Sequence, residues 1–516
     1  MKDFNVKVAS PKIKLITHTS EPFALAIASA RTCYSSDLVT PDQVTSNQKE
    51  RIGGAIYEAG HHTPFQHPTF VFSLEGVSRQ FVWSFLHSHP YYNSEQTSQR
   101  YVALDRAEVI VPQMNEQAQK VFNEAVLKSW DAYNKISDLL KNDFFVLMNA
   151  LGKIKNQTEK QIQVEAEKKA MENARYVVPI AASTTLYHTV SGIVLKRYER
   201  LMLSGDCPEE SRIVIQQMLD EVKKIDPEFL EKLPSTPINK NDLLENKILS
   251  GGESTATSEQ NNEEFDKRLN GKTAKLISHQ KDAEQIICNS LNEVLGTNLK
   301  EEEAIDWLLS PKKNPYLADT LNSTHHSPAM RALQHINYTF IKKISHTADS
   351  QDQRHRTVPA TRPLLSQVHT KNPDYYIPSV AAKNPEVKKI YEQTMQILWD
   401  AKNKLIELGV EPQKAVYILP NAVNIRYTQT GSLLNNFHKW RLRTCLNAQL
   451  EIFDASVDEI NEVAKVHPNI AKYIGPPCFI RDGIVENKPM EGPCPEGSRW
   501  CGISVWKAWP NVKRPF

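Results

Sequence analysis

The segment 351–356 has the residue types best suited to bind an anion, because it reads Gln-Asp-Gln-Arg-His-Arg. Its two guanidinium groups, Arg354 and Arg356, can donate paired hydrogen bonds to phosphate or pyrophosphate oxygens, with His355 between them. A bare Arg-x-Arg is more often a solvated basic loop. Here the segment follows a predicted strand and the sequence His-His-Ser-Pro at 325–328, and this context favours a binding role.

The chain repeats itself, and four short matches occur in the same order in both halves. The matching segments are 14–18 with 275–279, 61–64 with 325–328, 130–135 with 399–404, and 176–179 with 417–420. One such match could arise by chance, but four ordered matches indicate a tandem duplication.

Composition marks the joint between the two copies. Residues 250–262 are rich in Gly, Ser, Thr and Asn and show no apolar periodicity. Such a stretch cannot bury enough surface to fold by itself. We therefore predict a first copy at 1–235, a flexible linker at 236–269, and a second copy at 270–516 whose tail contains cysteine and tryptophan.

Each copy is expected to be an α+β unit, with a small mixed or antiparallel sheet flanked by long helices. Phe70, Phe72 and Leu74 alternate with more polar neighbours, the pattern of a half-buried strand, and its counterpart is predicted near 336–341. Apolar residues spaced within 115–140 and 386–408 predict amphipathic helices.

Composition and charge limit the classes of partner. The 516 residues include 62 Lys+Arg and 60 Asp+Glu, so the net charge of +2 gives no support for binding nucleic acid or a membrane. We find no apolar run long enough for a transmembrane helix and no signal core, which predicts a cytoplasmic protein. Seven cysteines are too sparse, and odd in number, for a disulfide scaffold.

The first copy carries a specific resemblance. Residues 60–67, followed by a strand and then Ser-Gln-Arg-Tyr at 98–101, resemble the flavin-dependent thymidylate synthases (ThyX). That family carries Arg-His-Arg, two spacer residues and Ser-x-Asn-Glu-x-Ser-x-Arg-Tyr. Here the tail of this signature is in the first copy and its Arg-His-Arg head is in the second. Residues 174–179 are similar to the family's Ala-Arg-x-x-Leu-Pro turn, and 448–452, preceded by Leu-Arg at 442–443, are similar to its late helix.

Each copy departs from the family pattern in a different way. In the first copy, His-Ser-His at 87–89 stands where Arg-His-Arg is expected, and Ser204 falls at the late-helix arginine. In the second copy, the signature tail keeps only Arg362, and Val416 replaces the turn arginine that Arg175 represents. Because these losses are complementary, we predict composite sites, each built from a first copy and a second copy.

The resemblance implies a methyltransferase reaction, the reductive methylation of dUMP to dTMP. The methylene group would come from methylenetetrahydrofolate, and the hydride from FAD that NADPH has reduced. The catalytic residue implied is Arg443, whose charge would stabilise negative charge on the uracil. The substrate-binding residues implied are Gln351, Arg354, Gln96, Ser98, Arg100 and Arg175. The flavin-binding residues implied are His61, Thr63, His325, Ser327, Arg354, His355 and Arg356.

Two alternatives stay open, and the assembly is a further expectation. The split signature also fits a nucleotide- or flavin-binding protein that lacks synthase activity. Four cysteines of the second copy could hold a structural zinc, but their spacing matches no tight knuckle, so we favour free thiols and predict no metal site. These are Cys445, Cys478, Cys494 and Cys501. The tail tryptophans, at 500, 506 and 509, are expected to pack as a cap. Because the family forms homotetramers, a homodimer of two-copy chains is predicted.

Overall fold

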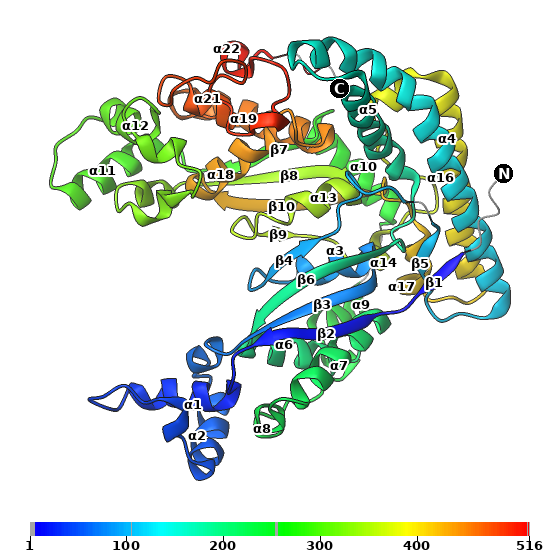
Figure 1. Ribbon diagram of the computed structural model, residues 1–516. Coiled ribbons are helices and arrows are strands. Elements are labelled where there is room, and N and C mark those ends of the chain that lie inside the picture. The colour runs from blue at the N-terminus through cyan, green and yellow to red at the C-terminus, as the bar shows by residue number, and fades with distance from the viewer. Residues whose placement is uncertain (1–5, 105, 253–255, 513, 515–516) are drawn as a thin grey trace. The chain divides into compact units, whose positions relative to one another are not determined.

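The computed structural model describes residues 6–104, 106–252, 256–512 and 514 (Figure 1). It divides into two compact units, and neither is a continuous half of the sequence. Unit 1 comprises Met1–Leu127, Pro179–Thr257 and Ala401–Leu419, whereas unit 2 comprises Lys128–Val178, Ser258–Asp400 and Pro420–Phe516. The units therefore do not follow the predicted boundaries at 235 and 270. Each unit includes a segment from the repeat that mainly builds the other.

The sheet of unit 1 has four antiparallel strands in the order β2-β3-β6-β4. They are β2 (Lys12–His18), β3 (Thr69–Ser78), β6 (Ser183–Ser191) and β4 (Asn93–Gln96). The predicted alternation in β3 is confirmed, because Phe70, Phe72 and Leu74 are fully buried. The pairing of β3 with β6 shifts register after Leu74, where Gly76 has φ 63°. A Cβ there would lie 2.4 Å from the Ser10 carbonyl oxygen, so only glycine fits this bulge.

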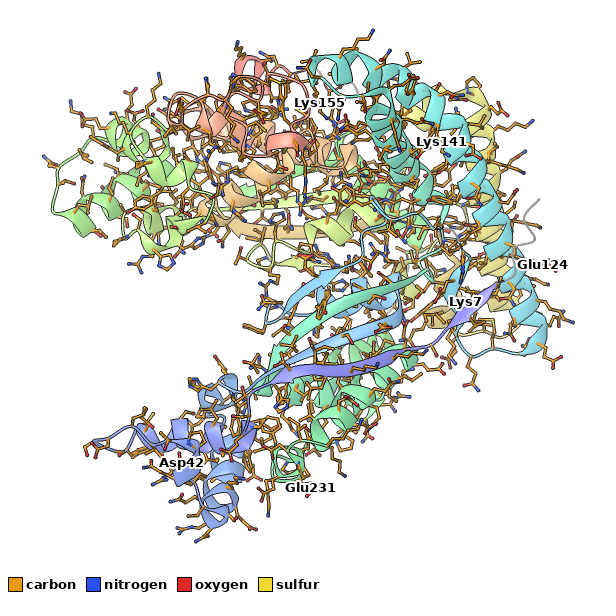
Figure 2. The ribbon with its side chains drawn as sticks, viewed as in Figure 1. Lys7, Asp42, Glu124, Lys141, Lys155 and Glu231 are labelled. Atoms are coloured by element: carbon orange, nitrogen blue, oxygen red, sulfur yellow. The ribbon has the colours of Figure 1, made fainter. Side chains whose placement is uncertain are left out.

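Helices and short elements complete unit 1. They are α1 (Pro22–Thr32), α2 (Ser46–Glu58), α3 (Arg79–Leu86), α6 (Gly192–Met202), α7 (Glu209–Lys223), α8 (Pro227–Glu231), α9 (Leu244–Gly251), α17 (Pro412–Ala415), and the parallel pair β1 (Lys7–Ala9) and β5 (Glu108–Ile110). The core of unit 1 joins the sheet to α3, α6 and α7 through apolar side chains such as Phe81, Val194 and Met218. Charged side chains such as Asp42 and Glu231 are exposed at its surface (Figure 2).

Unit 2 also has a sheet of four antiparallel strands, in the order β7-β8-β10-β9, and each strand takes the place of its counterpart in unit 1. Its strands are β7 (Ala274–His279), β8 (Asn337–Ser345), β10 (Asn424–Ser432) and β9 (Ala360–Thr361). Three helices lead from this sheet to the site described below: α13 (His346–Asp352), α18 (Leu433–Arg443) and α19 (Leu450–Val466). The remaining helices are α5 (Glu159–Ala174), α10 (Ser258–Leu269), α11 (Ala283–Leu295), α12 (Glu301–Leu309), α14 (Leu365–Val368), α15 (Ser379–Lys383), α20 (Pro468–Ala471), α21 (Pro477–Arg481) and α22 (Val505–Ala508). The unit boundaries at Leu127 and Asp400 fall inside α4 (Glu116–Ile154) and α16 (Pro385–Glu407), the helices predicted near 115–140 and 386–408.

Serine caps fix where the strands give way to helices. Ser345 ends β8, and its Oγ accepts a hydrogen bond from the Ala348 N–H at 3.1 Å, which starts α13. Ser78 does the same for α3 in unit 1, where its Oγ accepts from the Phe81 N–H at 2.8 Å. Each serine satisfies an N–H that the first helical turn leaves without a partner. The two repeats therefore share a strand–serine–helix corner.

The segment predicted as a flexible linker contains ordered structure. Residues 244–251 form α9 and 258–269 form α10, while 253–255 lie outside the described residues. Asp266 on α10 accepts hydrogen bonds from Arg426 Nε at 2.9 Å and from Lys343 Nζ at 2.7 Å. The C-terminal part of the segment is thus a helix held on the sheet of unit 2. Helix α10 has few apolar residues, and ion pairs hold it in place.

The C-terminal tail builds a small separate cluster in unit 2. Its buried members include Phe453, Cys478, Cys494 and Trp500, with Trp506 and Trp509 partly buried against them. The tryptophans therefore pack as a cap. None of the helices formed by the described residues is long and apolar enough to cross a membrane.

Candidate active site

A turn of the first repeat is built into unit 2. The Tyr176 hydroxyl donates a hydrogen bond to Glu451 Oε2 at 2.8 Å, and the same carboxylate accepts from the N–H of Ser345 at 2.5 Å and from its Oγ at 2.6 Å. Backbone bonds hold the turn in place, with Ala422 N donating to Tyr176 O at 3.0 Å. Burial raises the pKa of Glu451 to about 7, although Ser345 and Tyr176 stabilise its charge.

Unit 1 contains the same group with the repeats exchanged. The Tyr417 hydroxyl, from the second repeat, donates to Glu210 Oε2 at 2.7 Å. Glu210 also accepts from the N–H of Ser78 at 2.7 Å and from its Oγ at 2.6 Å. The main chain of the exchanged segment bonds as well, with Ile180 N donating to Leu419 O at 2.8 Å. Each repeat thus lends its tyrosine turn to the other's serine–glutamate pair.

The exchange places Arg175 in unit 2, next to residues of the second repeat. Arg175 Nη2 donates to Gln449 Oε1 at 2.5 Å, and Gln351 Nε2 donates to the same oxygen. Arg175 is 3% exposed and Gln449 2%, so the contact is buried. At the matching positions of unit 1, Val416 and Pro208 precede Tyr417 and α7, so no such contact can form there.

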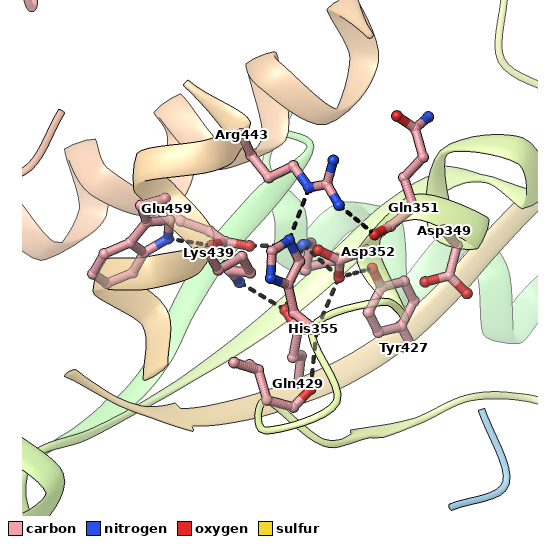
Figure 3. A network of polar contacts seen from close by, with 12 residues as sticks. Asp349, Gln351, Asp352, His355, Tyr427, Gln429, Lys439, Arg443 and Glu459 are labelled. Carbon is pink, nitrogen blue, oxygen red and sulfur yellow. Dashed lines mark hydrogen bonds and ion pairs between the residues drawn. The ribbon is translucent and has the colours of Figure 1, made fainter. Parts of the chain in front are cut away.

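Arg443, the last residue of α18, contacts both Gln351 and His355 (Figure 3). Its Nε donates to His355 Nε2 at 2.8 Å, and its Nη2 donates to the Gln351 carbonyl oxygen at 2.9 Å. Because arginine stays protonated, His355 Nε2 must be the acceptor, and the ring carries its proton on Nδ1. Burial and the Arg443 charge hold the pKa of His355 well below 6.5, so the imidazole is neutral.

Four fully buried charged side chains form a network next to the contact between Arg443 and His355 (Figure 3). Lys342 Nζ on β8 lies 3.0 Å from Asp352 Oδ2 and 2.7 Å from Glu459 Oε1. Lys439 Nζ on α18 lies 2.7 Å from Glu459 Oε2. These four side chains are completely shielded from solvent. Burial by itself raises the pKa of Asp352, but Lys342 and Lys439 outweigh it and hold that pKa well below 3.8.

Neutral side chains complete the network. The Tyr427 hydroxyl donates to Asp352 Oδ2 at 2.7 Å, and Gln429 Nε2 donates to the same oxygen at 2.8 Å. Lys439 Nζ donates to Gln429 Oε1 at 2.9 Å. The network therefore joins α13, α18, α19 and both central strands of the sheet.

The corresponding positions of unit 1 hold mostly apolar side chains. Helices α6 and α7 match α18 and α19 at a separation of 241 positions, and α3 matches α13 from its serine cap. The counterparts of Lys342, Asp352, Tyr427, Lys439 and Glu459 are Leu74, Phe85, Leu186, Tyr198 and Met218, all buried in the unit 1 core. The Tyr198 hydroxyl lies 2.9 Å from His188 Nε2 and 2.8 Å from His89 Nε2.

The predicted flavin-contact residues of unit 2 gather near the start of α18. His325 Nε2 lies 3.1 Å from Asn435 Oδ1, and Asn435 Nδ2 donates to the Thr357 carbonyl oxygen at 3.1 Å. Thr357 directly follows Arg354, His355 and Arg356 along the chain. Ser327 lies two residues after His325, where its Oγ accepts from the Met330 N–H at 3.3 Å.

This donor set fits a large anionic cofactor such as a flavin dinucleotide. Arg354 and Arg356 are half-buried cations, the type that binds a pyrophosphate. Among the described residues, buried His438 Nδ1 and both amide atoms of the 5%-exposed Gln353 have no hydrogen-bond partner. Buried polar atoms in native proteins are normally paired, so these orphaned groups are what a polar ligand would satisfy.

The structure brings only part of the predicted site together. Arg175, Gln351, His355 and Arg443 meet within unit 2. The remaining substrate residues belong to unit 1 and are not part of that group: Gln96, Ser98 and Arg100. Ser98 Oγ accepts from the Arg100 N–H at 3.2 Å, and the Arg100 guanidinium lies over the Tyr101 ring. His61 and Thr63 are exposed residues of unit 1.

One residue assignment of the first repeat needs correction, and several residues escaped prediction. Helix α6 ends at Met202 as α18 ends at Arg443, so Met202, and not Ser204, occupies the late-arginine position of the first repeat. The missed residues are Tyr176, Lys342, Lys439, Gln449, Glu451 and Glu459. Of these, Lys342 could have been found from the sequence, because it continues the alternation of the buried residues Tyr338 and Phe340 along the strand.

The four C-terminal cysteines, Cys445, Cys478, Cys494 and Cys501, are free thiols in the structure. Burial raises the pKa of Cys445 to about 12, and the nearby thiols Cys501 and Cys494 add to the rise. No three His, Cys, Asp or Glu side chains are grouped as ligands of a metal ion in the part of the chain that the structure describes.

Comparison with known proteins places the chain in a family. The model for the thymidylate synthase complementing protein family matches residues 14–228 and 275–469, one segment in each repeat. The chain belongs to this family, which confirms the resemblance seen in its split signature.

Two curated relatives of the chain are flavin-dependent thymidylate synthases. That of Clostridium tetani is 30% identical, over 46% of this chain and 91% of the relative. That of Sulfolobus acidocaldarius is 29% identical, over 42% of this chain and 82% of the relative. Among solved structures, the UMP/dUMP methylase PolB from Streptomyces cacaoi bound with 5-Br dUMP matches at 17% identity and a TM-score of 0.34, covering 44% of this chain and 96% of that chain.

Proposed function

We propose that the protein is a thymidylate synthase that converts dUMP to dTMP by reductive methylation, using methylenetetrahydrofolate, FAD and NADPH. The observation that carries the proposal is the buried contact of Arg175 with Gln449 and Gln351, next to Arg443. These residues come from both repeats, and Arg175, Gln351 and Arg443 are among those that the family resemblance implies. The relatives supply the activity class, which is flavin-dependent thymidylate synthesis.

Each side chain has a distinct role in this proposal. Arg175 and Gln351 bind the phosphate of dUMP, since guanidinium and amide N–H groups suit its oxygens. Arg443 stabilises negative charge that develops on the uracil ring, which makes the ring a better carbon nucleophile. Gln96, Ser98 and Arg100 of a first repeat complete the phosphate site. His355 accepts from Arg443 and holds its guanidinium in one orientation.

The flavin would be held by Arg354, His355 and Arg356 with His325 and Ser327. When bound, it supplies the hydride transfer, and the protein binds and orients the reactants. Unit 1 keeps none of the charged network and has Met202 in place of Arg443. We therefore propose one working site per chain, centred on unit 2. His61 and Thr63 of unit 1 then have no catalytic part.

The test uses purified protein with dUMP tritiated at carbon 5. An active synthase is yellow and releases tritium to water when methylenetetrahydrofolate and NADPH are present. A yellow protein that binds dUMP without release would instead be the inactive binding protein that the split signature also fits. A colourless protein that neither binds dUMP nor releases tritium would contradict both functions.

A further inference from the structure

Two of the buried charges of unit 2 lie beside Gln351 and Arg443, the residues that meet at the site. Asp352 ends α13 and follows Gln351, while Lys439 lies one turn before Arg443 on α18. Glu459 on α19 accepts from Lys439 and also from Trp440 Nε1, at 2.5 Å. Both ends of the Arg443–Gln351 contact are thus anchored in the same network.

The fold does not need these charges in order to pack. Buried ion pairs are often no more stabilising than apolar side chains of similar volume, because each charge loses its hydration. Unit 1 provides the comparison within the same chain. Leu74, Phe85, Tyr198 and Met218 occupy the four matching positions there and are at most 3% exposed. A role beyond stability must account for the charges of unit 2.

We propose that Lys342, Asp352, Lys439 and Glu459 form a positioning network that holds Arg443 against a neutral His355. This inference rests on the proposed function and adds to it four residues that touch neither substrate nor cofactor. Asp352 fixes the end of α13 through Lys342, Tyr427 and Gln429. Lys439 fixes the last turn of α18 through Glu459 and Gln429. The 2.8 Å contact between Arg443 and His355 lies between these two anchors.

Burial and the groups around His355 together lower its pKa and keep the ring neutral. From α18 it faces Arg443, Lys439 and His438, and each disfavours a proton on the ring. From α13 it faces Asp352, which favours one. Lys342 and Glu459 contact Asp352 and Lys439 from β8 and α19. In a protonated His355, Nε2 would carry a hydrogen and could not accept the hydrogen bond from Arg443. The contact therefore requires the neutral ring.

The first experiment replaces the network with the unit 1 residues. The fourfold variant carries Lys342→Leu, Asp352→Phe, Lys439→Tyr and Glu459→Met. We expect a folded protein that melts no lower than the wild type, with kcat for tritium release reduced by about 100-fold, the effect of a displacement of about 1 Å. KM for dUMP should change much less, because Arg175 and Gln449 are untouched. Unchanged kcat would overturn the proposal, and so would an unfolded variant.

The second experiment needs no activity, so it separates this proposal from the proposed function. The variant Lys439→Met/Glu459→Gln removes one positive and one negative charge and leaves Lys342 with Asp352. NMR of 13C-labelled histidines, with His355→Gln to identify the signal, should show no titration of His355 in the wild type between about pH 5.5 and 8. In the variant the pKa of His355 should be higher, because Lys439 no longer disfavours the ring proton, and the signal should change as the pH falls toward 5.5.

A matched control is available one turn further along α19. Glu462 pairs there with Lys272, and Lys272→Met/Glu462→Gln should leave the His355 signal and kcat unchanged. A His355 signal that behaves alike in the wild type and in the Lys439→Met/Glu459→Gln variant would overturn the proposal. A wild type without tritium release, but with the expected His355 shift, would contradict only the proposed function.

Discussion

Tyr176 and Glu451 come from different repeats, yet the hydroxyl of one donates to the carboxylate of the other at 2.8 Å across 275 positions of sequence. Tyr417 and Glu210 make the reciprocal contact at 2.7 Å. The exchange places a turn arginine of the first repeat, Arg175, at the proposed site, which is built mainly from the second repeat. It also gives each unit a matched control in the other.

Replacing the two tyrosines separates stability from function. Tyr176→Phe and Tyr417→Phe should each lower the free energy of unfolding by about 1–3 kcal/mol, because each removes a donor from a buried carboxylate. Only Tyr176→Phe should also weaken dUMP binding, since Tyr176 accepts from Gln449, which holds Arg175. Chemical denaturation and dUMP titration measure the two effects. Equal loss of dUMP binding in both variants would contradict the assignment of the site to unit 2.

Removing the arginines should show which repeats share a site. Arg175→Ala and Arg443→Ala should each abolish turnover, and each lost charge-assisted contact should weaken dUMP binding by about 10- to 150-fold. Val416→Ala, at the position of unit 1 that matches Arg175, is the control and should keep full turnover.

Mixing Arg175→Ala chains with Arg443→Ala chains tests where the two arginines meet. Within unit 2 they belong to one chain, so the mixture should remain inactive. Recovery of about a quarter of the wild-type rate, the fraction expected if subunits of a dimer exchange freely and sites form between chains, would show that the arginines act across chains.

Stability should fall with rising pH through the range in which Glu451 ionises. Burial raises the pKa of Glu451 from 4.5 to about 7, so the folded state binds a proton that the unfolded state has lost. That stabilisation is complete below pH 4.5 and disappears as the pH rises through 7. Glu451→Gln, which cannot ionise, should show a smaller loss of unfolding free energy between pH 5 and pH 8. An identical loss in the variant and the wild type would assign the effect to other groups.

The segment predicted as a linker should divide into two parts of different importance. Asp266→Asn should lower the free energy of unfolding by about 1–3 kcal/mol, because it weakens the pairs with Arg426 and Lys343. Deleting 244–252 should leave stability and turnover close to the wild type, since its residues are exposed or half-buried. Thermal denaturation of both variants is the measurement. Equal losses in the two would mean that α9 also supports the fold.

The assembly remains the prediction made from the family's homotetramers. We propose a homodimer, in which four repeats reproduce four subunits. Light scattering should give about twice the chain mass of 58.7 kDa. A stable monomer with full tritium release would show that one chain suffices.

Sequence patterns predicted the duplication, the two α+β units and some polar residues of the candidate site, because motifs and alternation are local properties. Arg443, Arg175 and Gln351 followed from the family signature. The Tyr176–Glu451 contact did not, since a pairing across 275 positions leaves no local pattern. The linker prediction relied on composition, which cannot show that Asp266 meets Arg426 in the folded chain. Lys439 and Glu459 read as ordinary helix charges, and only the packing of α18 on α19 shows that both are buried.

The exchanged tyrosine turns also bear on what happens at synthesis. Two diverged copies made as independent polypeptides would face a sorting problem, with like and unlike pairs competing for the same surfaces. A single reading frame delivers both halves at equal dose and at high local concentration, so the unlike pairing wins without any dedicated recognition feature. Each half could then specialise, because its complement is always present.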